Sequence, residues 1–259
     1  DDGETLSVGW SVPIEDPDPT IVHAGPRLLV WQDADRRQPI AMSVEAETGE
    51  VAWLNPSVAS LFPASRSGEA LPQNGQRSIP GSTEIWRWDE VLPGMVEDLL
   101  VMVRRNGDIV ALESDDGTTV RWTIENVVDV VQHVEHGPLG VLVAGESRRG
   151  DGDRTVPEIV LVAADGQVVR RWPLDEAVDR EIRWIRQTPL GEVIWGTTDG
   201  VSRRGLMPGD GEADDRWSLR PPQLRESWQA WARPGRLVVR ERSDRLGTWR
   251  TRDGRRVSD

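Results

Sequence analysis

The chain has 259 residues, with 44 Asp or Glu against 31 Lys or Arg, all of them Arg, and a formal net charge of −13. So acidic a chain is a poor candidate for binding nucleic acid or anionic lipid, because both need a surface that neutralises phosphate. The chain lacks Cys, which excludes disulfides, thiolate nucleophiles and Cys-based zinc sites. No apolar stretch approaches the roughly 18 residues of a membrane span, so we expect no direct membrane insertion.

A glycine turn followed a few residues later by Trp recurs along the chain. The pairs are Gly3 with Trp10, Gly49 with Trp53, Gly117 with Trp122, Gly166 with Trp172 and Gly211 with Trp217, and a sixth turn at Gly254 lacks its Trp. The successive glycines are 46, 68, 49, 45 and 43 residues apart. A period in the forties built from short apolar runs indicates repeated β units.

Each unit contains four strand-like segments. In chain order, we expect first strands at 20–23, 88–92, 128–132, 182–185 and 228–231. The second strands, which are the most apolar, are expected at 27–31, 98–102, 140–144, 192–195 and 236–240, each after a glycine-bearing turn such as Pro93-Gly94. The third strands are expected at 40–44, 109–112, 159–162, 201–206 and 247–250. The fourth strand follows the repeat glycine and ends at the Trp, and no segment shows helical periodicity.

Four antiparallel strands repeated radially predict an all-β fold, a β-propeller of about five four-stranded blades in a single domain over 1–259. The regular Trp would fill the wedge between adjacent blades. Residues 4–10 form an orphan outer strand, and we expect them to close the ring beside residues 247–251, which removes exposed sheet edges. The alternative is an arc cut from a larger ring.

Two segments, 40–53 and 109–122, resemble the blade motif of pyrroloquinoline-quinone-type propeller repeats. In that motif a strand reading roughly "ALD" meets a "TG" turn and a strand that ends in Trp, as in Ile109-Val-Ala-Leu-Glu-Ser-Asp-Asp-Gly-Thr-Thr-Val-Arg-Trp122. The family includes quinoprotein alcohol dehydrogenases and BamB-like outer-membrane assembly lipoproteins, usually with seven or eight blades. The resemblance implies the fold, whereas the functions of the family diverge. The vicinal Cys pair of a quinoprotein dehydrogenase is missing, and we expect no cofactor.

The long, irregular segments all join second to third strands or one unit to the next, so they should emerge on one face. They are 32–39, 54–82, 146–158, 173–180 and 218–227. Loops on a rigid scaffold commonly carry binding. The candidate partner-binding residues are Arg36, Arg37, Leu61, Phe62, Trp86, Arg148 and Arg149. The competing interpretations are solvated Arg side chains, and a Leu-Phe pair that covers an apolar rim.

The 13 Trp also invite a sugar-stacking interpretation, although most are phased with the repeat and Trp86 and Trp88 are the better candidates for exposure. Catalytic patterns are sparse, because only His23, His133 and His136 occur and no zinc spacing is convincing. The segment Gly150–Asp153 is a fragment of a calcium loop without the remaining acidic ligands.

The sequence therefore favours a non-enzymatic scaffold that holds a protein partner, which could be membrane-associated, on its long-loop face. It could be an assembly factor, a sensor domain or a subunit of a larger complex. The alternative is a glycoside-active or glycan-binding propeller with carboxylates in its central funnel. Missing Lys and Tyr indicate a GC-rich bacterial genome, and we expect an extracytoplasmic location, in the periplasm or at the cell surface. The sequence starts abruptly at Asp1 without an export-signal pattern, which leaves open a signal or anchor that was cleaved or that lies outside this sequence.

Overall fold

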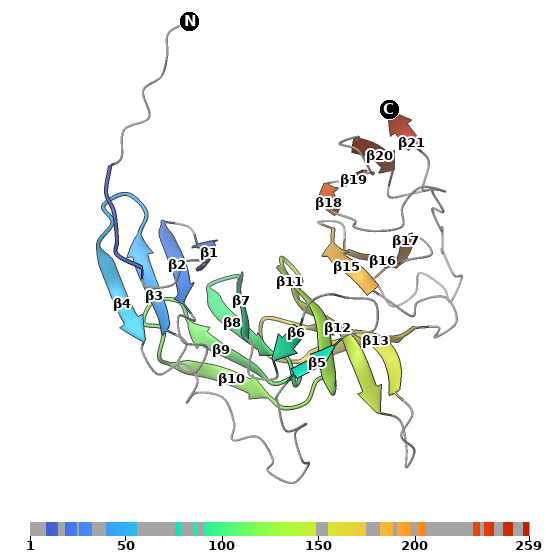
Figure 1. Cartoon of the computed structure of the whole chain (residues 1–259), viewed down its shortest axis with the longest axis horizontal. Helices are drawn as coiled ribbons and strands as arrows, with labels where there is room; N and C mark the ends of the chain where they lie inside the picture. The colour runs from blue at the N-terminus through green and yellow to red at the C-terminus, as the bar shows by residue number, and fades with distance from the viewer. Residues whose placement is uncertain are drawn as a thin grey trace, which may run out of the picture. The chain divides into compact units, whose positions relative to one another are not determined.

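The computed structural model describes residues 9–14, 19–24, 26–32, 40–55, 76–78, 85–87, 91–148, 155–174, 182–188, 191–197, 201–205, 230–233, 236–240, 246–250 and 256–258. The regular structure of these residues is β-strand throughout, which confirms the all-β prediction (Figure 1). Within these ranges no helix is long and apolar enough to cross a membrane. The chain divides into two compact units, 1–103 with 108–125 and 104–107 with 126–259. The single domain over 1–259 stays a prediction.

The first unit holds two four-stranded antiparallel sheets, called blades 1 and 2. Blade 1 runs in the order β1 (Thr20–Ala24), β2 (Arg27–Gln32), β3 (Ile40–Glu45) and β4 (Val51–Asn55). Blade 2 runs in the order β7 (Val91–Val96), β8 (Leu99–Arg104), β9 (Ile109–Glu113) and β10 (Val120–Ile124). Between them in sequence lies a hairpin of β5 (Gln76–Ser78) and β6 (Ile85–Arg87). β5 falls in the segment 54–82 that was expected to be irregular, and no strand was expected at the position of β6.

The second unit holds blades 3, 4 and 5. Blade 3 consists of β11 (Val130–Gly137), β12 (Gly140–Arg148), β13 (Thr155–Val162) and β14 (Val168–Pro173). Blade 4 has three described strands, β15 (Ile182–Gln187), β16 (Glu192–Thr197) and β17 (Val201–Gly205). Blade 5 consists of β18 (Ala230–Arg233), β19 (Arg236–Arg240), β20 (Leu246–Arg250) and β21 (Arg256–Ser258).

The second strand of each blade lies where the apolar runs predict it. Residues 99–103 of β8, 140–145 of β12 and 192–197 of β16 are buried without interruption. A strand flanked on both edges and covered on both faces reads as a continuous apolar run, and this pattern is why the sequence located these strands well.

A Trp at the end of blade 1 docks on the next blade of the same unit. Trp53 of β4 donates its indole N–H to the carbonyl oxygen of Ser114, 2.8 Å away in the turn between β9 and β10. A Cβ added to Gly117 of that turn would lie 2.4 Å from the Trp53 ring, so only glycine lets the indole approach so closely. Asn55 adds a buried hydrogen bond of 2.7 Å from its Nδ2 to the Gly117 carbonyl. The repeated Trp is thus a packing residue here, as the repeat predicts.

The N-terminal segment repeats this docking on blade 1. The indole N–H of Trp10 donates to the carbonyl oxygen of Ala46 at 3.0 Å. A Cβ at Gly49 would lie 2.6 Å from the Trp10 ring. In both cases the acceptor residue precedes the turn glycine by three positions. Trp10 in residues 9–14 therefore docks on the turn of blade 1 in the same way as Trp53 at the end of β4 docks on the turn of blade 2.

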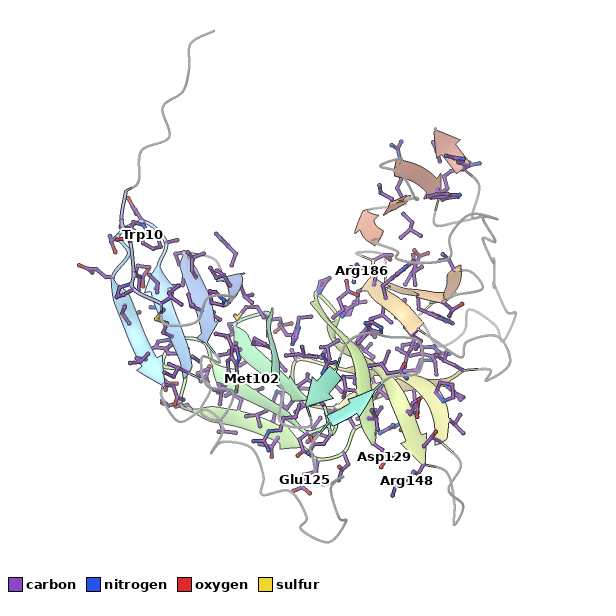
Figure 2. All side chains as sticks on the ribbon, viewed as in Figure 1. Trp10, Met102, Glu125, Asp129, Arg148 and Arg186 are labelled. Atoms are coloured by element: carbon purple, nitrogen blue, oxygen red, sulfur yellow. The ribbon has the colours of Figure 1, made fainter. Side chains whose placement is uncertain are left out.

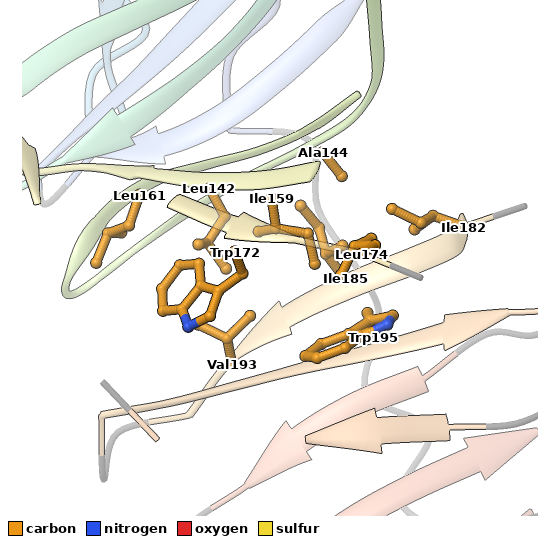
Figure 3. Packing of buried hydrophobic residues seen from close by; sticks show 10 residues of the cluster. All are labelled: Leu142, Ala144, Ile159, Leu161, Trp172, Leu174, Ile182, Ile185, Val193 and Trp195. Carbon is orange, nitrogen blue, oxygen red and sulfur yellow. The ribbon is translucent and has the colours of Figure 1, made fainter. Parts of the chain in front are cut away.

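The core of the second unit is built around two indoles (Figure 3). Trp172 of β14 and Trp195 of β16 are 2% and 0% exposed and pack in one cluster with aliphatic side chains of blades 3 and 4. The other members of that cluster are Leu142, Ala144, Ile159, Leu161, Leu174, Ile182, Ile185 and Val193. Large flat side chains at this interface fill the space that opens between the two twisted sheets.

The first strand of blade 2 lies later in the sequence than expected. Pro93 and Gly94 are inside β7 rather than in the turn before β8, and the turn is formed by Glu97 and Asp98, with Glu97 at a φ of 54°. A proline is tolerated there because β7 is the edge strand of its sheet and needs to donate fewer ladder hydrogen bonds.

Blade 5 shows one difference from the expected closure of the ring. β20 pairs with β19 on one edge and with β21 on the other, so the outer position beside residues 247–251 is taken by the C-terminal strand of the chain. The expected pairing of residues 4–10 at that place is therefore wrong. Residues 4–8 lie outside the described residues, and closure of the ring stays a prediction.

Candidate interaction surface

The long-loop end of blade 3 is tied together by polar contacts. Arg148, the last residue of β12, donates its backbone N–H to Oδ2 of Asp129 at 2.5 Å, and Figure 2 shows the two residues side by side. Asp129 lies just before β11, and its own N–H donates to the Glu146 carbonyl at 2.9 Å. The segment that enters blade 3 is thereby fastened to the base of loop 149–154.

A single carboxylate bridges three strands of this end. Oε1 of Glu146 accepts a hydrogen bond of 3.1 Å from Nε2 of Gln132 on β11, and Oε2 accepts one of 3.0 Å from Oγ1 of Thr155 on β13. Hydrogen bonds to an ionised acceptor are stronger than neutral ones. Both ends of loop 149–154 are therefore held by the same side chain.

An ion pair between a buried carboxylate and an exposed guanidinium group supports the same end of blade 3. The side chain of Glu158 is 6% exposed, and its Oε1 lies 2.9 Å from Nη1 of Arg171 on β14. Oε1 also accepts a hydrogen bond from the Ser147 hydroxyl. Arg171 donates in addition to the Val127 carbonyl at 2.9 Å. Because a buried carboxylate needs such partners, this network fixes the backbone on either side of the loop.

The carboxylates of this end act as hydrogen-bond acceptors within blade 3. The carboxylates of Glu146 and Glu158 accept hydrogen bonds from amide, hydroxyl or guanidinium groups. Among the described residues no group of three or more His, Asp or Glu could hold a metal ion. A rigid base that carries a loop is the usual design of a recognition surface.

The structure describes two of the seven residues expected to bind a partner. Arg148 is exposed at the end of β12, at the base of the long loop, as expected. Trp86 lies in β6, where its backbone is in register with Arg77. The two residues belong to different units. The other five, Arg36, Arg37, Leu61, Phe62 and Arg149, lie outside the described residues. The binding role of all seven stays a prediction.

The carboxylates that organise this end were missed by the sequence analysis. The signal for Glu158 was present, since it directly precedes the apolar run of Ile159–Val162, which was expected to form a third strand. A charged residue at such a position needs a partner. Asp129 and Glu146 carried no comparable signal, because their partners are set by the register of β11 with β12.

Most Trp with described side chains are core residues, which does not favour the sugar-stacking interpretation for them. Five are between 0% and 6% exposed, namely Trp31, Trp172, Trp184, Trp195 and Trp249. Trp88, Trp217 and Trp228 lie outside the described residues. The side chain of Trp86 is not among those described, so its expected exposure stays a prediction.

The three His that were considered for chemistry all lie on strands of the blades, His23 on β1 and His133 and His136 on β11. Nε2 of His133 is 2.8 Å from the Ile182 carbonyl and so links β11 to β15. His23 lies on β1 and is exposed. The calcium-like segment Gly150–Asp153 lies outside the described residues.

One carboxyl on an inner strand has an unusual environment. Burial raises the pKa of Glu135 on β11 to about 8, and the positive charge of Arg186 opposes part of this increase. The backbone N–H of Gln187 donates to the carboxylate, which also lowers the pKa. Oε2 of Glu135 is buried without a hydrogen-bond partner. A neutral carboxylic acid at this place can act as a proton donor.

The neighbouring side chain of Gln187 joins blades 3 and 4. Its Nε2 donates to the Gly140 carbonyl at 2.8 Å, and its Oε1 accepts from the Leu139 N–H at 3.1 Å. Gly137 is in close contact with this amide, because an added Cβ would lie 2.9 Å from its carbon. The turn between β11 and β12 is thus held by a side chain of β15.

An apolar cavity in the first unit lies between β2 and β8. Its lining includes Leu29, Trp31, Trp53 and Leu100, and it encloses about 10 Å³, the space of one water molecule. This cavity is too small for a cofactor.

Neither family models nor curated proteins match this sequence, whereas solved structures do. The crystal structure of BamB from Moraxella catarrhalis is similar with a TM-score of 0.53 and 12% identity over 97% of this chain. Sqt1 from Saccharomyces cerevisiae has a TM-score of 0.53 and 9% identity over 92% of the chain. The WD40 domain of Pan2 from Neurospora crassa has a TM-score of 0.50 and 8% identity over 95%.

These likenesses and the repeated four-stranded sheets define the class of protein as a β-propeller. At such identities they establish the fold alone. The chain spans 64%, 61% and 65% of the lengths of the three similar chains, in the order given above, so it is shorter than each of them.

Proposed function

We propose that this β-propeller is a non-enzymatic scaffold that holds a protein partner on its long-loop face. The observation that carries the proposal is the network at blade 3, where Asp129, Glu146 and Glu158 fasten both flanks of loop 149–154. A rigid base lowers the entropy that a loop loses on binding. Arg148 at that base offers a planar guanidinium group to carboxylates of a partner.

The setting that fits this scaffold best lies outside the cytoplasm of a GC-rich bacterium, as the composition suggests. The pyrroloquinoline-quinone-type repeat is part of this proposal, since the docking of Trp53 on the Ser114 turn agrees with the motif read in 109–122. We propose one of three roles, namely a BamB-like assembly factor, the sensor domain of a membrane protein, or a subunit of a larger complex.

Site-specific photo-crosslinking on the full chain tests this function. A photoreactive residue replaces Arg148 in one variant and Val169, an exposed residue of the outer strand β14, in a matched control. We expect a discrete crosslinked protein from envelope extracts with the probe at 148 and none with the probe at 169. Equal labelling from both positions, or none at 148 with the fold intact, would contradict the long-loop face as the binding surface.

The alternative function is a glycoside-active propeller, and one observation favours it. Glu135 has the raised pKa of a general acid, and it lies on the first strand of blade 3, which a propeller turns toward its central axis. Such chemistry needs a second, ionised carboxylate about 5–10 Å away. The charged group that acts on Glu135 is instead the cation Arg186.

Hydrolysis assays separate the two functions. A panel of aryl glycosides is incubated with the wild-type chain and with Glu135→Gln. Turnover that the substitution abolishes would establish the enzyme, whereas no turnover in either chain agrees with the scaffold. Crosslinking from position 148 should be unchanged in Glu135→Gln if the scaffold function is correct.

A further inference from the structure

The outer edge of blade 1 differs from the other outer edges in its charge. β4 reads Val51-Ala-Trp-Leu-Asn55 and contains no charged residue, and no strand among the described residues pairs with its outer side. The outer strands of blades 2, 3 and 5, which are β10, β14 and β21, each contain Arg, and β14 also ends in a proline. Charged side chains and proline are the usual means by which a sheet prevents further pairing at its edge. A register shift, which also protects edges, occurs in all four strands and does not distinguish them.

The same edge exposes a large aliphatic side chain where two other blades have polar ones. Leu54 is in register with Met42 of β3 and is 56% exposed. Counted back from the residue that closes the following turn, the matching positions hold Thr123 in blade 2 and Arg171 in blade 3. Arg171 is held there by the carboxylate of Glu158. The repeat itself therefore does not require an aliphatic side chain at this position.

Leu54 is continuous with other apolar side chains of blade 1. Val51, on the same strand, is 49% exposed. Both lie in register with β3 residues, Met42 and Val44, whose side chains belong to an apolar cluster against which residues 9–14 pack. Residues in register on adjacent strands point to the same face of the sheet. A strand added beside β4 would therefore bury aliphatic side chains against an apolar surface that continues inward from the edge.

The start of β4 is acidic. Glu50 directly precedes the strand and Glu47 lies in the turn before it, and both are exposed. Among the described residues neither carboxylate has an ion pair, whereas the carboxylate of Glu45 pairs with Arg27. A segment that lies along β4 would bring one of its ends next to these two carboxylates, and a positive charge at that end would be favoured.

We propose that β4 receives an extended segment of a protein partner as a fifth, antiparallel strand of blade 1. The backbone of the segment pairs with the N–H and C=O groups of β4 that point away from β3. Its aliphatic side chains cover Val51 and Leu54, and a Lys or Arg near its C-terminal end lies beside Glu50. This edge is not part of the long-loop face, so the proposal goes beyond the function proposed above and does not rest on it.

A partner of this chemistry fits the edge better than a second copy of the chain does. A second copy carries the same carboxylates at the start of its own β4 and a net charge of −13, so like charges would meet. In a pair of two β4 strands no Lys or Arg of either strand faces Glu50, because β4 contains neither residue. The charge at the start of the strand therefore selects a different protein.

Fluorescence anisotropy of a labelled peptide with the full chain tests the proposal. The probe is a short peptide with blocked ends that alternates Val and Thr and finishes in two Lys. We expect saturable binding that weakens as the salt concentration rises. Leu54→Thr, which installs the residue of blade 2, should weaken binding about fivefold, and Glu50→Gln should weaken it about threefold. A probe with Pro at its central position should not bind, because proline cannot donate to the ladder.

Two variants of blade 3 are the matched controls. Val169→Thr changes a residue of β14 that is 56% exposed, as Leu54 is, and Asp165→Asn removes an exposed charge from the turn before β14. Peptide binding should stay within about twofold of wild type in both. No binding to wild type, equal losses in Leu54→Thr and Val169→Thr, or undiminished binding of the probe with Pro would each overturn the proposal. A wild-type dimer in sedimentation that Leu54→Thr dissociates would also overturn it, because the edge would then belong to a second copy.

Discussion

The indole N–H of Trp53 donates a hydrogen bond of 2.8 Å to the carbonyl oxygen of Ser114, a residue 61 positions further along the chain. The indole of blade 1 is thereby docked on a turn of blade 2. Trp10 donates to the Ala46 carbonyl in the same way. The two contacts explain why glycine and Trp recur together, since each indole docks on a turn that contains a repeat glycine.

Replacing Trp53 should separate the two parts of this contact. Trp53→Phe keeps an aromatic ring but loses the hydrogen bond, and should lower the free energy of unfolding by about 1–2 kcal/mol. Trp53→Ala also removes the packing and should cost about 3–5 kcal/mol. Chemical denaturation measures both. Leu54→Ala on the same strand is the control, because Leu54 is 56% exposed and should cost under about 0.5 kcal/mol. Equal costs at positions 53 and 54 would contradict the docking.

Adding one methyl group at Gly117 should disturb the same contact from the other side. Gly117 has a φ of +63°, and the new Cβ would lie 2.4 Å from the Trp53 ring. Gly191→Ala is a matched control, since its φ is +79° and nothing lies within 4 Å of the added carbon. We expect about 1–2 kcal/mol of backbone strain in the control and a clearly larger loss in Gly117→Ala. Thermal unfolding of both variants compares them, and similar shifts would show that the indole does not depend on the glycine.

Stability should fall as the pH rises from about 5 to 8 because of Glu135. Burial raises the pKa of Glu135 from 4.5 to about 8 in the folded chain. Below pH 4.5 both the folded and the unfolded chain bind this proton, so the group has no effect on stability. Between pH 4.5 and 8 the unfolded chain releases the proton first, so the folded state is progressively disfavoured. Above about pH 8 the loss is complete.

The control for this pH dependence is Glu135→Gln, which removes the titrating group. The free energy of unfolding of Glu135→Gln, relative to wild type, should increase between pH 5 and pH 8. Glu125→Gln, at an exposed position after β10, should follow wild type at both values. A wild-type chain and a Glu135→Gln variant with parallel pH profiles would show that the carboxyl is not buried as described.

Breaking the Arg171–Glu158 pair should cost more than removing it entirely. Arg171→Met leaves the Glu158 carboxylate, 6% exposed, with the Ser147 hydroxyl but without its cation, and should destabilise the chain by about 2–3 kcal/mol. Adding Glu158→Gln should recover a large part of this loss, because the buried charge is gone. A double-mutant cycle by chemical denaturation measures the coupling. Strictly additive costs would show that the two side chains do not interact.

The sequence identified the strands better than it identified the site. The runs at 99–103 and 192–195 could be located because a strand covered on both faces is apolar at every position. The turn after β7 was misplaced because Pro93-Gly94 has the composition of a turn. The two residues instead lie in β7, at the edge of the sheet, and only the strand pairing shows that β7 is an edge strand. Likewise, Leu54 and Met42 become neighbours only through the register of β4 with β3.

The amino-acid order by itself determined the all-β repeat, the positions of most strands, the packing role of Trp53 and the absence of Cys chemistry. These features depend on composition and on the spacing of residue types along the chain, which the sequence itself contains. Only the tertiary structure decided which turn receives each indole, that Glu146 and Glu158 secure the loop of blade 3, and that Glu135 is buried beside Arg186. Those relations join residues from different strands, and the free energy of such contacts depends on distances that the order of residues does not contain.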